Sequence, residues 1–486
     1  MYNSQTSDKR QGVHAESANS EITSTKACPV RCGNLLQNPS FEAGLFGWET
    51  ANVSSMSREN VFEGTQVARM GYFEASMFQD VSIANTGHEP LFLSFNVIQT
   101  ADPTRSVGKL VAEVLWLDAD RNTIAYGLRL HLPNGRINTV SWLTLFDITD
   151  QPPAGAVWAR LLFSRRTAGE TDIDIDQVIL APVDTANLVQ NPSFELGLTD
   201  WTAAKFKPTF ERALEGVAAV VASESDTLYQ DVPLTNLPVN SSFLFSFAGL
   251  GFDGPSLSVK VLWVNETDAV IGTGLDLSIP SLTNAQGNYL SFLDITSPAP
   301  AAAKARILFT ATVPIASNLR LDQVILARVP TTNLVQNPSY ENGLNNWFPV
   351  NVTSLTTNLA YEGTKVARVD EDGGVLFQQV PIAPAADHCF LLNFGLGYRK
   401  LENVAAYSGD ILAKVYWLDQ HGREIGLGLS LVLPGFIPSM NQWRVYTGIT
   451  EPAPRCAVTA RVQFTKEDGS TLGVVDIDHV VLSRLV

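Results

Sequence analysis

Two acidic residues recur at matching positions in three stretches of this 486-residue chain. Each stretch has a glutamate near its start and an aspartate near its end: Glu42 with Asp176, Glu195 with Asp322, and Glu341 with Asp478. A glycosidase needs two carboxylates that face one bond. These acids instead belong to repeated motifs with a structural explanation, so they do not by themselves indicate catalysis.

The other residue types that support catalysis do not repeat. The chain has six histidines, and none occupies an equivalent position in all three stretches, so none belongs to a shared catalytic triad. They are His14, His88, His131, His388, His421 and His479. The sequence also lacks a Gly-x-Ser-x-Gly elbow, a phosphate-binding loop and a His-Glu-x-x-His motif. We therefore predict that the protein is not an enzyme.

Four cysteines interrupt the repeat. Cys28 and Cys32 precede the first stretch, where the further ligands of a zinc site are missing, and Cys389 and Cys456 lie in the third. One hypothesis joins Cys28 or Cys32 to Cys389 or Cys456 of another molecule, which would give head-to-tail covalent chains. The competing hypotheses are two local bridges, Cys28 with Cys32 and Cys389 with Cys456, or free thiols.

The elements that position these residues follow from one repeated motif. Asn-Pro-Ser-Phe-Glu-x-Gly-Leu-x-x-Trp begins at Asn38, Asn191 and Asn337, with Tyr340 in place of phenylalanine in the last copy. The copies lie roughly 150 residues apart, which is the length of a whole domain. The sequence predicts a flexible, Cys-containing arm over residues 1–33, followed by domains over residues 34–183, 187–329 and 333–486.

Each predicted domain consists of short stretches typical of strands. After the opening motif come a Glu-Gly turn, which begins at Glu63, Glu215 or Glu362, and an apolar run that alternates with a period of two. Eight or so strands without helical periodicity predict an all-β fold of three tandem β-sandwiches. The linkers are short, so we expect a fixed, string-like arrangement. Because each unit has its own strands, a fragment over residues 187–329 should fold alone.

Composition argues against several classes of partner. Charged residues make up 17% of the chain, so the surface must be mostly neutral and polar. A net charge of −16 disfavours nucleic acid. No apolar stretch is long enough for a transmembrane helix, and Met1 to Ser20 lack the apolar core of a signal peptide.

Aromatic residues are the candidates for contact with sugar rings. The repeated tryptophans are predicted to belong to the core: Trp48, Trp201 and Trp347 in the opening motif, and Trp116, Trp263 and Trp417 in mid-strand. Aromatics that do not repeat are better ligand candidates, namely Tyr72, Phe73, Phe206, Phe210, Phe252, Tyr398 and Tyr407. No position is common to the three units, so a shared sugar site is not supported.

The motifs resemble two known groups of proteins. The opening Asn-Leu-x-x-Asn-Pro-x-Phe-Glu-x-Gly-x-x-x-Trp, the Glu-Gly turn and the closing Ile-Asp-x-Val are similar to calcium-binding jelly-roll carbohydrate-binding modules of xylanases and cellulases. The Trp-Leu-Asp, Gly-Leu and Pro-Ala-x-Ala-x-Ala-Arg stretches resemble jelly-roll domains of bacterial spore-surface and collagen-like proteins. The resemblance implies three tandem jelly-roll domains.

The first resemblance also implies structural calcium. In such modules the glutamate of the opening motif, a backbone carbonyl at the Glu-Gly turn and an aspartate of the closing strand surround the ion. The matching acids here are Glu42 with Asp176, Glu195 with Asp322, and Glu341 with Asp478. The second aspartate of the module is Gln177, Gln323 or His479 here, which removes a charged ligand and should weaken binding. The alternative is that these acids are hydrogen-bonded groups at strand ends.

Two hypotheses of function remain. The first is a non-catalytic structural protein that self-assembles, as a homo-oligomer or fibre, on a bacterial spore or cell surface, with no recognisable signal peptide. The alternative is a protein that binds carbohydrate, with polysaccharides or other glycans as partners. We also expect an extracellular or surface location and structural Ca2+. We expect no nucleic-acid partner and no transmembrane segment.

Overall fold

The computed structural model describes residues 32–57, 60–100, 108–138, 141–166, 169–282, 287–369, 373–382, 387–400, 406–437, 442–467 and 473–486. Apart from Cys32 and Gly33, the predicted arm with its Cys28 lies outside these residues. Within them the regular elements are strands, so the all-β class is confirmed. No helix in the described part of the chain is long and apolar enough to cross a membrane.

The strands divide among three domains. Domain 1 has β1 (Glu49–Ala51), β2 (Val53–Ser57), β3 (Gln66–Met70), β4 (Ala75–Ser82), β5 (Leu91–Gln99), β6 (Leu110–Leu117), β7 (Thr123–Leu132), β8 (Leu143–Ile148), β9 (Trp158–Arg165) and β10 (Ile173–Pro182). Domain 2 has β11 (Thr202–Ala203), β12 (Lys207–Thr209), β13 (Ala219–Ala222), β14 (Asp226–Pro233), β15 (Ser242–Phe252), β16 (Ser256–Val264), β17 (Val270–Ile279), β18 (Leu290–Ile295), β19 (Lys304–Thr312) and β20 (Asn318–Val329). Domain 3 has β21 (Phe348–Val350), β22 (Val352–Thr356), β23 (Lys365–Val369), β24 (Val375–Pro381), β25 (Leu391–Lys400), β26 (Ala406–Tyr407), β27 (Ile411–Leu418), β28 (Glu424–Leu433), β29 (Phe436–Ile437), β30 (Gln442–Ile449), β31 (Thr459–Lys466) and β32 (Gly473–Ser483).

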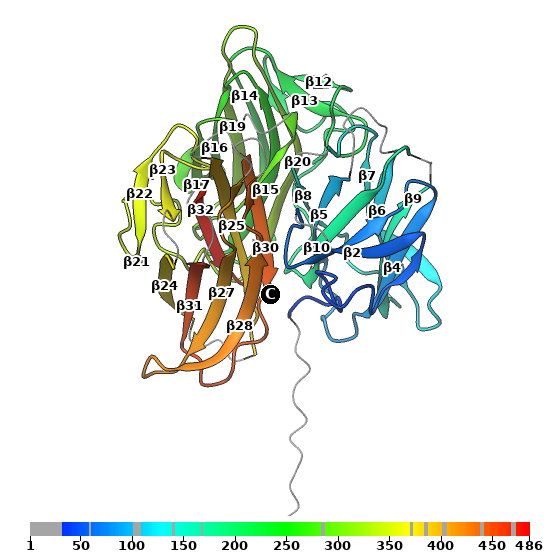
Figure 1. The fold of residues 1–486 in the computed structure, drawn as a ribbon. Coiled ribbons are helices and arrows are strands. Elements are labelled where there is room, and N and C mark those ends of the chain that lie inside the picture. Colours follow the sequence, from blue (N-terminus) through cyan, green and yellow to red (C-terminus); the bar gives the residue numbers. More distant parts are fainter. Residues whose placement is uncertain are drawn as a thin grey trace, which may run out of the picture.

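Each domain is a jelly roll of two antiparallel five-stranded sheets (Figure 1). In domain 1 the outer sheet has the order β1-β4-β9-β6-β7 and the inner sheet the order β2-β3-β10-β5-β8, and domains 2 and 3 repeat both orders. The third domain adds a ribbon of β26 and β29. Each domain therefore has more strands than the eight or so predicted, because the polar strands that follow the opening motif are too short to show in the sequence.

The opening motif forms a loop that closes on itself. The Asn38 amide donates to the carbonyl oxygens of Gly44 and Phe46, and Asn38 Oδ1 accepts a hydrogen bond from the Ala43 N–H at 3.0 Å. The indole N–H of Trp48 donates to the Asn38 carbonyl, and the ring packs against Phe41. The equivalent bonds recur at Asn191 and Asn337. All six repeated tryptophans are buried, so their core assignment is confirmed.

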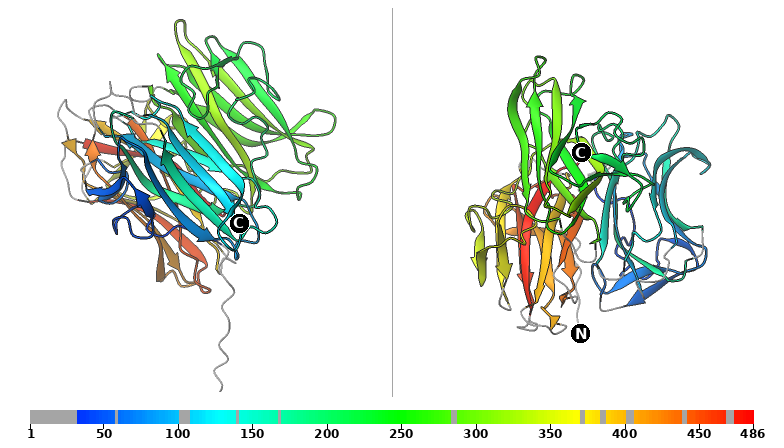
Figure 2. Two further views of the ribbon diagram at one scale, coloured as in Figure 1. Left: turned by 90° about the vertical axis from the view of Figure 1, so that its right-hand side faces the viewer. Right: turned by 90° about the horizontal axis from the view of Figure 1, so that it is seen from above.

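The three domains close into a ring (Figure 2). The inner-sheet edge strands β8, β18 and β30 pack against one another in all three pairings. The predicted string-like arrangement is therefore wrong. A string would leave these apolar sheet edges in water, whereas the ring covers each edge with the next domain.

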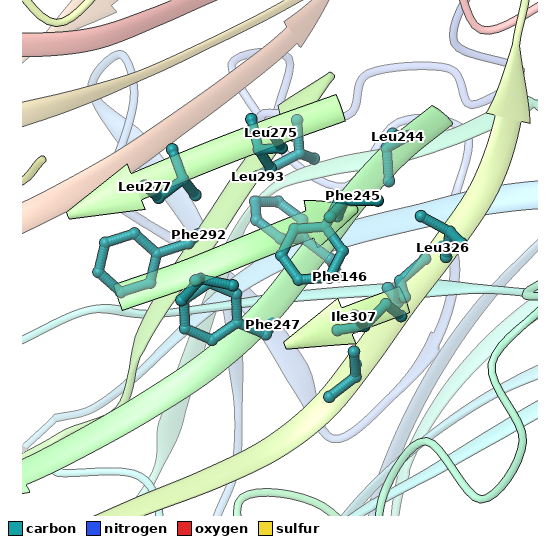
Figure 3. Close-up of a cluster of buried hydrophobic side chains, with 14 of the residues drawn as sticks. Phe146, Leu244, Phe245, Phe247, Leu275, Leu277, Phe292, Leu293, Ile307 and Leu326 are labelled. Carbon is teal, nitrogen blue, oxygen red and sulfur yellow. The ribbon is translucent and has the colours of Figure 1, made fainter. Parts of the chain in front are cut away.

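The hydrophobic cores extend across the seams of the ring. Phe146 of β8 faces away from the core of its own domain and joins the domain 2 cluster with Phe247 and Phe292 (Figure 3). Each domain also contributes several residues to the cluster of its neighbour, and two large ones lie at matching positions in all three domains. These pairs are Phe62 and Trp142 from domain 1 into domain 3, Leu214 and Tyr289 from domain 2 into domain 1, and Tyr361 and Trp443 from domain 3 into domain 2.

The Glu-Gly turns bind the neighbouring domain in a cycle. In the seam between domains 1 and 3, the Gly64 N–H donates to the Val432 carbonyl at 2.8 Å, and the Val432 N–H donates to Glu63 Oε1 at 2.9 Å. Glu215 and Gly216 bind His131 of domain 1 in the same way, and Glu362 and Gly363 bind Ser278 of domain 2. Three equivalent seams, each of one turn and one outer-sheet edge strand, thus close the ring.

Candidate functional site

The aspartates of the closing strands lie beneath the Glu-Gly turns. Asp176 is fully buried, and its Oδ2 accepts the N–H groups of Phe62 and Glu63 at 3.0 Å. Asp322 and Asp478 hold the turns of their own domains with the same bonds. Burial raises the pKa of all three carboxyls well above the usual value, although the N–H donors oppose this. The aspartates therefore fix the shape of the turns that build the seams.

The glutamates of the opening motif bind the next residues of the same turns. Glu42 Oε1 accepts the N–H groups of Thr65 and Gln66 at 2.8 and 2.7 Å, and Glu195 and Glu341 repeat this arrangement. Gly64 has a φ of +65°, and a Cβ there would lie 2.5 Å from the Glu42 carboxylate carbon. The contact explains why glycine follows glutamate in each turn.

The predicted calcium ligands are thus brought to one turn in each domain, where both carboxylates already accept N–H donors. This is the hydrogen-bonding alternative that the sequence left open. Within the described residues, no group of three or more histidine, cysteine, aspartate or glutamate side chains is suited to a metal. Calcium prefers several oxygen ligands, so the two carboxylates, which already accept N–H donors, would need further oxygen ligands such as backbone carbonyls to hold it. Calcium binding by these acids stays a prediction.

The residues in place of the module's second aspartate reach into the neighbouring domain. The Gln177 amide donates to the Thr447 carbonyl of domain 3 at 3.2 Å, and the Gln323 amide lies 3.5 Å from the Asp147 carboxylate of domain 1. His479 Nε2 lies 3.2 Å from the Leu293 carbonyl oxygen and 3.6 Å from the Asp294 carboxylate of domain 2. These three residues therefore contribute contacts between neighbouring domains of the ring. The sequence showed the positions but not the contacts.

The cysteines pair in a way that none of the hypotheses proposed. Cys32 and Cys389 form a disulfide within one chain, with Cα atoms 5.5 Å apart and a sequence separation of 357 residues. The local bridges are wrong, and so is an intermolecular bond from either of these residues, because ring closure places Cys32 beside the start of β25, where Cys389 lies. Cys456 is exposed and free, and Cys28 lies outside the described residues.

The aromatic ligand candidates lie in different environments. Phe206 and Tyr398 are buried, so their prediction as ligand contacts is wrong: the loop before β12 folds Phe206 back onto the core, and Tyr398 lies within strand β25. Tyr72 and Phe73 are exposed and pack against each other with ring centroids 4.3 Å apart, and Phe210 is also exposed. Phe252 lies beneath Arg212, and the Tyr407 side chain lies outside the described part of the chain.

A repeated surface feature that the sequence analysis missed lies on the outer sheets. In domain 1 the Arg160 guanidinium lies 4.2 Å above the Phe78 ring and binds both oxygens of Asp80, at 2.6 and 2.9 Å. Arg306 lies over Tyr229 and binds Asp231 in domain 2, and Arg461 lies over Phe377 and Tyr416 in domain 3. Two repeated patterns in the sequence could have indicated this feature. One is the Ala-Arg pair, and the other is the aromatic residue directly before Gln in the strand that pairs with it.

Domain 1 carries the most elaborate version of this feature. Arg121 also binds Asp80, at 2.6 Å, and lies 4.2 Å over the Trp158 ring. Burial raises the pKa of Asp80, but the bonds from the two arginines outweigh it and hold the pKa below its usual value. Phe78 borders two hollows, one of about 660 Å³ toward Leu115 and Arg166 and one of about 390 Å³ toward Trp158. Aromatic rings together with fixed polar groups are what a sugar can pack against and hydrogen-bond to.

No family model and no curated protein sequence matches the chain. Among solved structures, the N-terminal CBM22-1–CBM22-2 tandem domain of Paenibacillus barcinonensis Xyn10C is similar, with 15% identity over 62% of this chain and 100% of that chain and a TM-score of 0.27. Family 16 Carbohydrate Binding Module-2 matches at 22% identity over 30% of this chain and 99% of its own, with a TM-score of 0.24. TmCBM61, solved with beta-1,4-galactotriose, matches at 19% identity over 32% of this chain and 99% of its own, with a TM-score of 0.23. The resemblance to carbohydrate-binding modules is confirmed, and at this level it concerns the fold and not the ligand.

Proposed function

We propose that the protein is a non-catalytic carbohydrate-binding protein whose ligand site is the outer sheet of domain 1. The observation that supports this is the pair of half-buried residues Phe78 and Arg160, held by the nearly buried Asp80 carboxylate, with the hollows beside them. Both arginines are already paired with Asp80, and the chain carries a net charge of −16, so an uncharged polysaccharide suits the face better than a polyanion. Its place is outside the cell or on a surface, where such polymers occur.

Affinity electrophoresis and pull-down on insoluble polysaccharides test this function. Phe78→Ala and Trp158→Ala should each weaken binding about tenfold or more, because each removes a stacking face worth roughly 1–2 kcal/mol. Tyr229→Ala in domain 2, at the position equivalent to Phe78, is the matched control and should keep most of the binding. Loss of binding in the control alone, or no retention on any polysaccharide tested, would contradict the proposal.

The second candidate is a structural protein that assembles on a spore or cell surface. The observation that favours it is the exposed thiol of Cys456, on a chain that has Cys28 in its N-terminal arm. With Cys32 and Cys389 paired to each other, a covalent head-to-tail chain would have to join Cys28 to Cys456 of another molecule. Non-reducing electrophoresis of Cys456→Ser decides it. Oligomers that persist in this variant would contradict the crosslink.

A further inference from the structure

The ring has three seams but only two peptide connections. Residues 184–186 lead from domain 1 to domain 2, and residues 330–332 lead from domain 2 to domain 3. Because the chain passes through the domains in this order, no linker runs from domain 3 back to domain 1. The seam between domains 1 and 3 therefore lacks the tether that the other two possess.

The Cys32–Cys389 disulfide lies where this missing connection would be. Cys32 is two residues before Asn34, whose side-chain amide donates to the Val178 carbonyl within the closing strand β10 at 2.9 Å. Cys389 is two residues before Leu391, which pairs with Ser483 at the end of the closing strand β32. The disulfide thus joins the point where the chain leaves domain 3 to the point where it enters domain 1.

Domain 1 shows what occupies the equivalent place when a linker is present. The residue that matches Cys389 there is Pro90, and its carbonyl accepts a hydrogen bond from the Val183 N–H at 2.9 Å. Val183 directly follows β10 and continues into the linker to domain 2. A cross-link from Cys389 therefore starts from the same part of the jelly roll from which a peptide linker departs in domain 1.

We propose that the Cys32–Cys389 disulfide acts as the third linker of the ring, and that its reduction releases the seam between domains 1 and 3 while the other two stay closed. To form it, the two thiols lose two electrons and two protons to a low-molecular-weight disulfide, which becomes two thiols. A dithiol reverses the step and is itself oxidised to a cyclic disulfide.

The noncovalent contacts of this seam are of the same kind as those of the other two, so what distinguishes it is the lack of a peptide linker. A cavity of about 780 Å³ lies in it, lined by Cys32, Glu63 and Gln177 on one side and by Leu431 and Ile449 on the other. The contacts that span it include those of Glu63 and Gly64 with Val432, of Gln177 with Thr447, of Thr144 with Val445, and of Asn60 with Arg444, together with the packing of Phe62 on Tyr446. A short tether keeps such surfaces together by raising their effective concentration.

Hydrogen exchange on the full chain tests the proposal, because the three seams carry equivalent amides. The amides of Gly64 and Val432 report on the seam between domains 1 and 3, those of Gly216 and His131 on the seam between domains 1 and 2, and those of Gly363 and Ser278 on the seam between domains 2 and 3. After reduction with dithiothreitol, or in Cys389→Ser, exchange at the first pair should become about tenfold faster, while the other pairs change less than about twofold. Cys456→Ser serves as the matched control and should leave all three pairs unchanged.

The double variant Cys32→Ser, Cys389→Ser should behave as either single variant does, because all three remove one bond. If a variant does not fold, the wild-type protein reduced under native conditions gives the answer, with thiol labelling to show that the bond is open. Equal acceleration at all three seams, or no change at the first pair in labelled protein, would overturn the proposal.

Discussion

The seams of the ring and the outer faces of its sheets repeat with different fidelity. Each seam uses the same glutamate, glycine and buried aspartate, and each closes on an equivalent edge strand of the neighbour. The outer faces keep an arginine over an aromatic ring, but the acid that holds this arginine is Asp80 in domain 1, Asp231 in domain 2 and Glu424 in domain 3. The seam contacts are therefore the same in all three domains, because each is needed to close the ring. The outer faces differ between the domains, as is expected of surfaces that are free to acquire a binding role.

One seam position shows how strongly the interior is constrained. The Ser291 hydroxyl of domain 2 donates to the Thr144 carbonyl of domain 1 at 2.6 Å, and the Thr144 hydroxyl lies 3.2 Å from the Val445 carbonyl of domain 3. Val445 has no hydroxyl with which to complete the cycle. Tyr361 of domain 3 supplies the bond to the Ser291 carbonyl instead, from a position that is Phe62 in domain 1 and Leu214 in domain 2.

The largest effect should come from removing both neighbours of one domain. A fragment over residues 187–329 has its own sheets and should fold, but it exposes Leu214, Tyr289 and Phe292, which are buried in the ring. It also presents both halves of a seam, the Glu215 turn and β17. We expect it to associate through them, with a trimer as the closed form. Light scattering coupled to size exclusion checks this, and a stable monomer at tens of micromolar would show that the seams are weak.

The next effect should come from the buried aspartate that shapes a turn. Asp322→Ala leaves the N–H groups of Leu214, Glu215 and Gln323 without an acceptor, which should cost on the order of 3 kcal/mol. The melting temperature should fall by roughly 6–12 °C in calorimetry. Asp276→Ala removes only an exposed ion pair with Lys260 and should change the melting temperature little. Equal shifts in the two variants would contradict the role of the seam.

A smaller effect should appear as a dependence on pH. Burial raises the pKa of Glu63 and of Asp147 at the seams to about 7, because the charged forms lose their hydration. The folded state then holds protons more tightly than the unfolded chain, so stability is full below about pH 4 and falls as pH rises toward 7. We expect the free energy of unfolding to be larger at pH 5.5 than at pH 8 by on the order of 2 kcal/mol, and the melting temperature to be correspondingly higher at pH 5.5. Glu63→Gln should flatten this profile, and a melting temperature that rises toward pH 8 would contradict it.

The Tyr361 hydroxyl of domain 3 should contribute about 1 kcal/mol to the free energy of unfolding. Tyr361→Phe removes the hydrogen bond to the Ser291 carbonyl and should lower stability by about that amount. Val445→Thr restores a hydroxyl at the position that Thr144 occupies in domain 1, so the double variant should recover part of the loss in a thermodynamic cycle. If the two changes are additive, the hydroxyls do not substitute for each other.

The smallest effect on stability should come from the outer face. Arg160→Ala removes one of the two arginines that bind the nearly buried Asp80 carboxylate, and because Arg121 keeps its bond, stability should fall by only about 1 kcal/mol or less. The same variant should reduce polysaccharide binding, because Arg160 lies over the Phe78 ring and supplies N–H donors to the binding face. If Arg160→Ala clearly lowers the melting temperature but leaves polysaccharide binding unchanged, the outer face serves stability and not binding, which would contradict the account.

Sequence periodicity and the repeated motif were enough to predict the fold of each domain. The loop closed by the Asn38 side chain and the core position of Trp48 depend on contacts between residues close together in the sequence, so they could be predicted from the motif. The ring was not predictable, because its contacts join residues such as Glu63 and Val432, which lie 369 positions apart. The disulfide partner of Cys32 and the role of Gln177 were missed for the same reason, since both depend on how the domains pack.

Small-angle X-ray scattering of the chain without residues 1–31 tests most directly whether the three domains close into a ring. A closed particle of this size should have a radius of gyration of about 23 Å, as expected for a compact chain of its length. A string of three domains would exceed that value by roughly half, because its outer domains lie far from the centre of mass. A radius near the compact value, together with a scattering curve that matches the ring, is the predicted result. A clearly extended particle would contradict the closed arrangement.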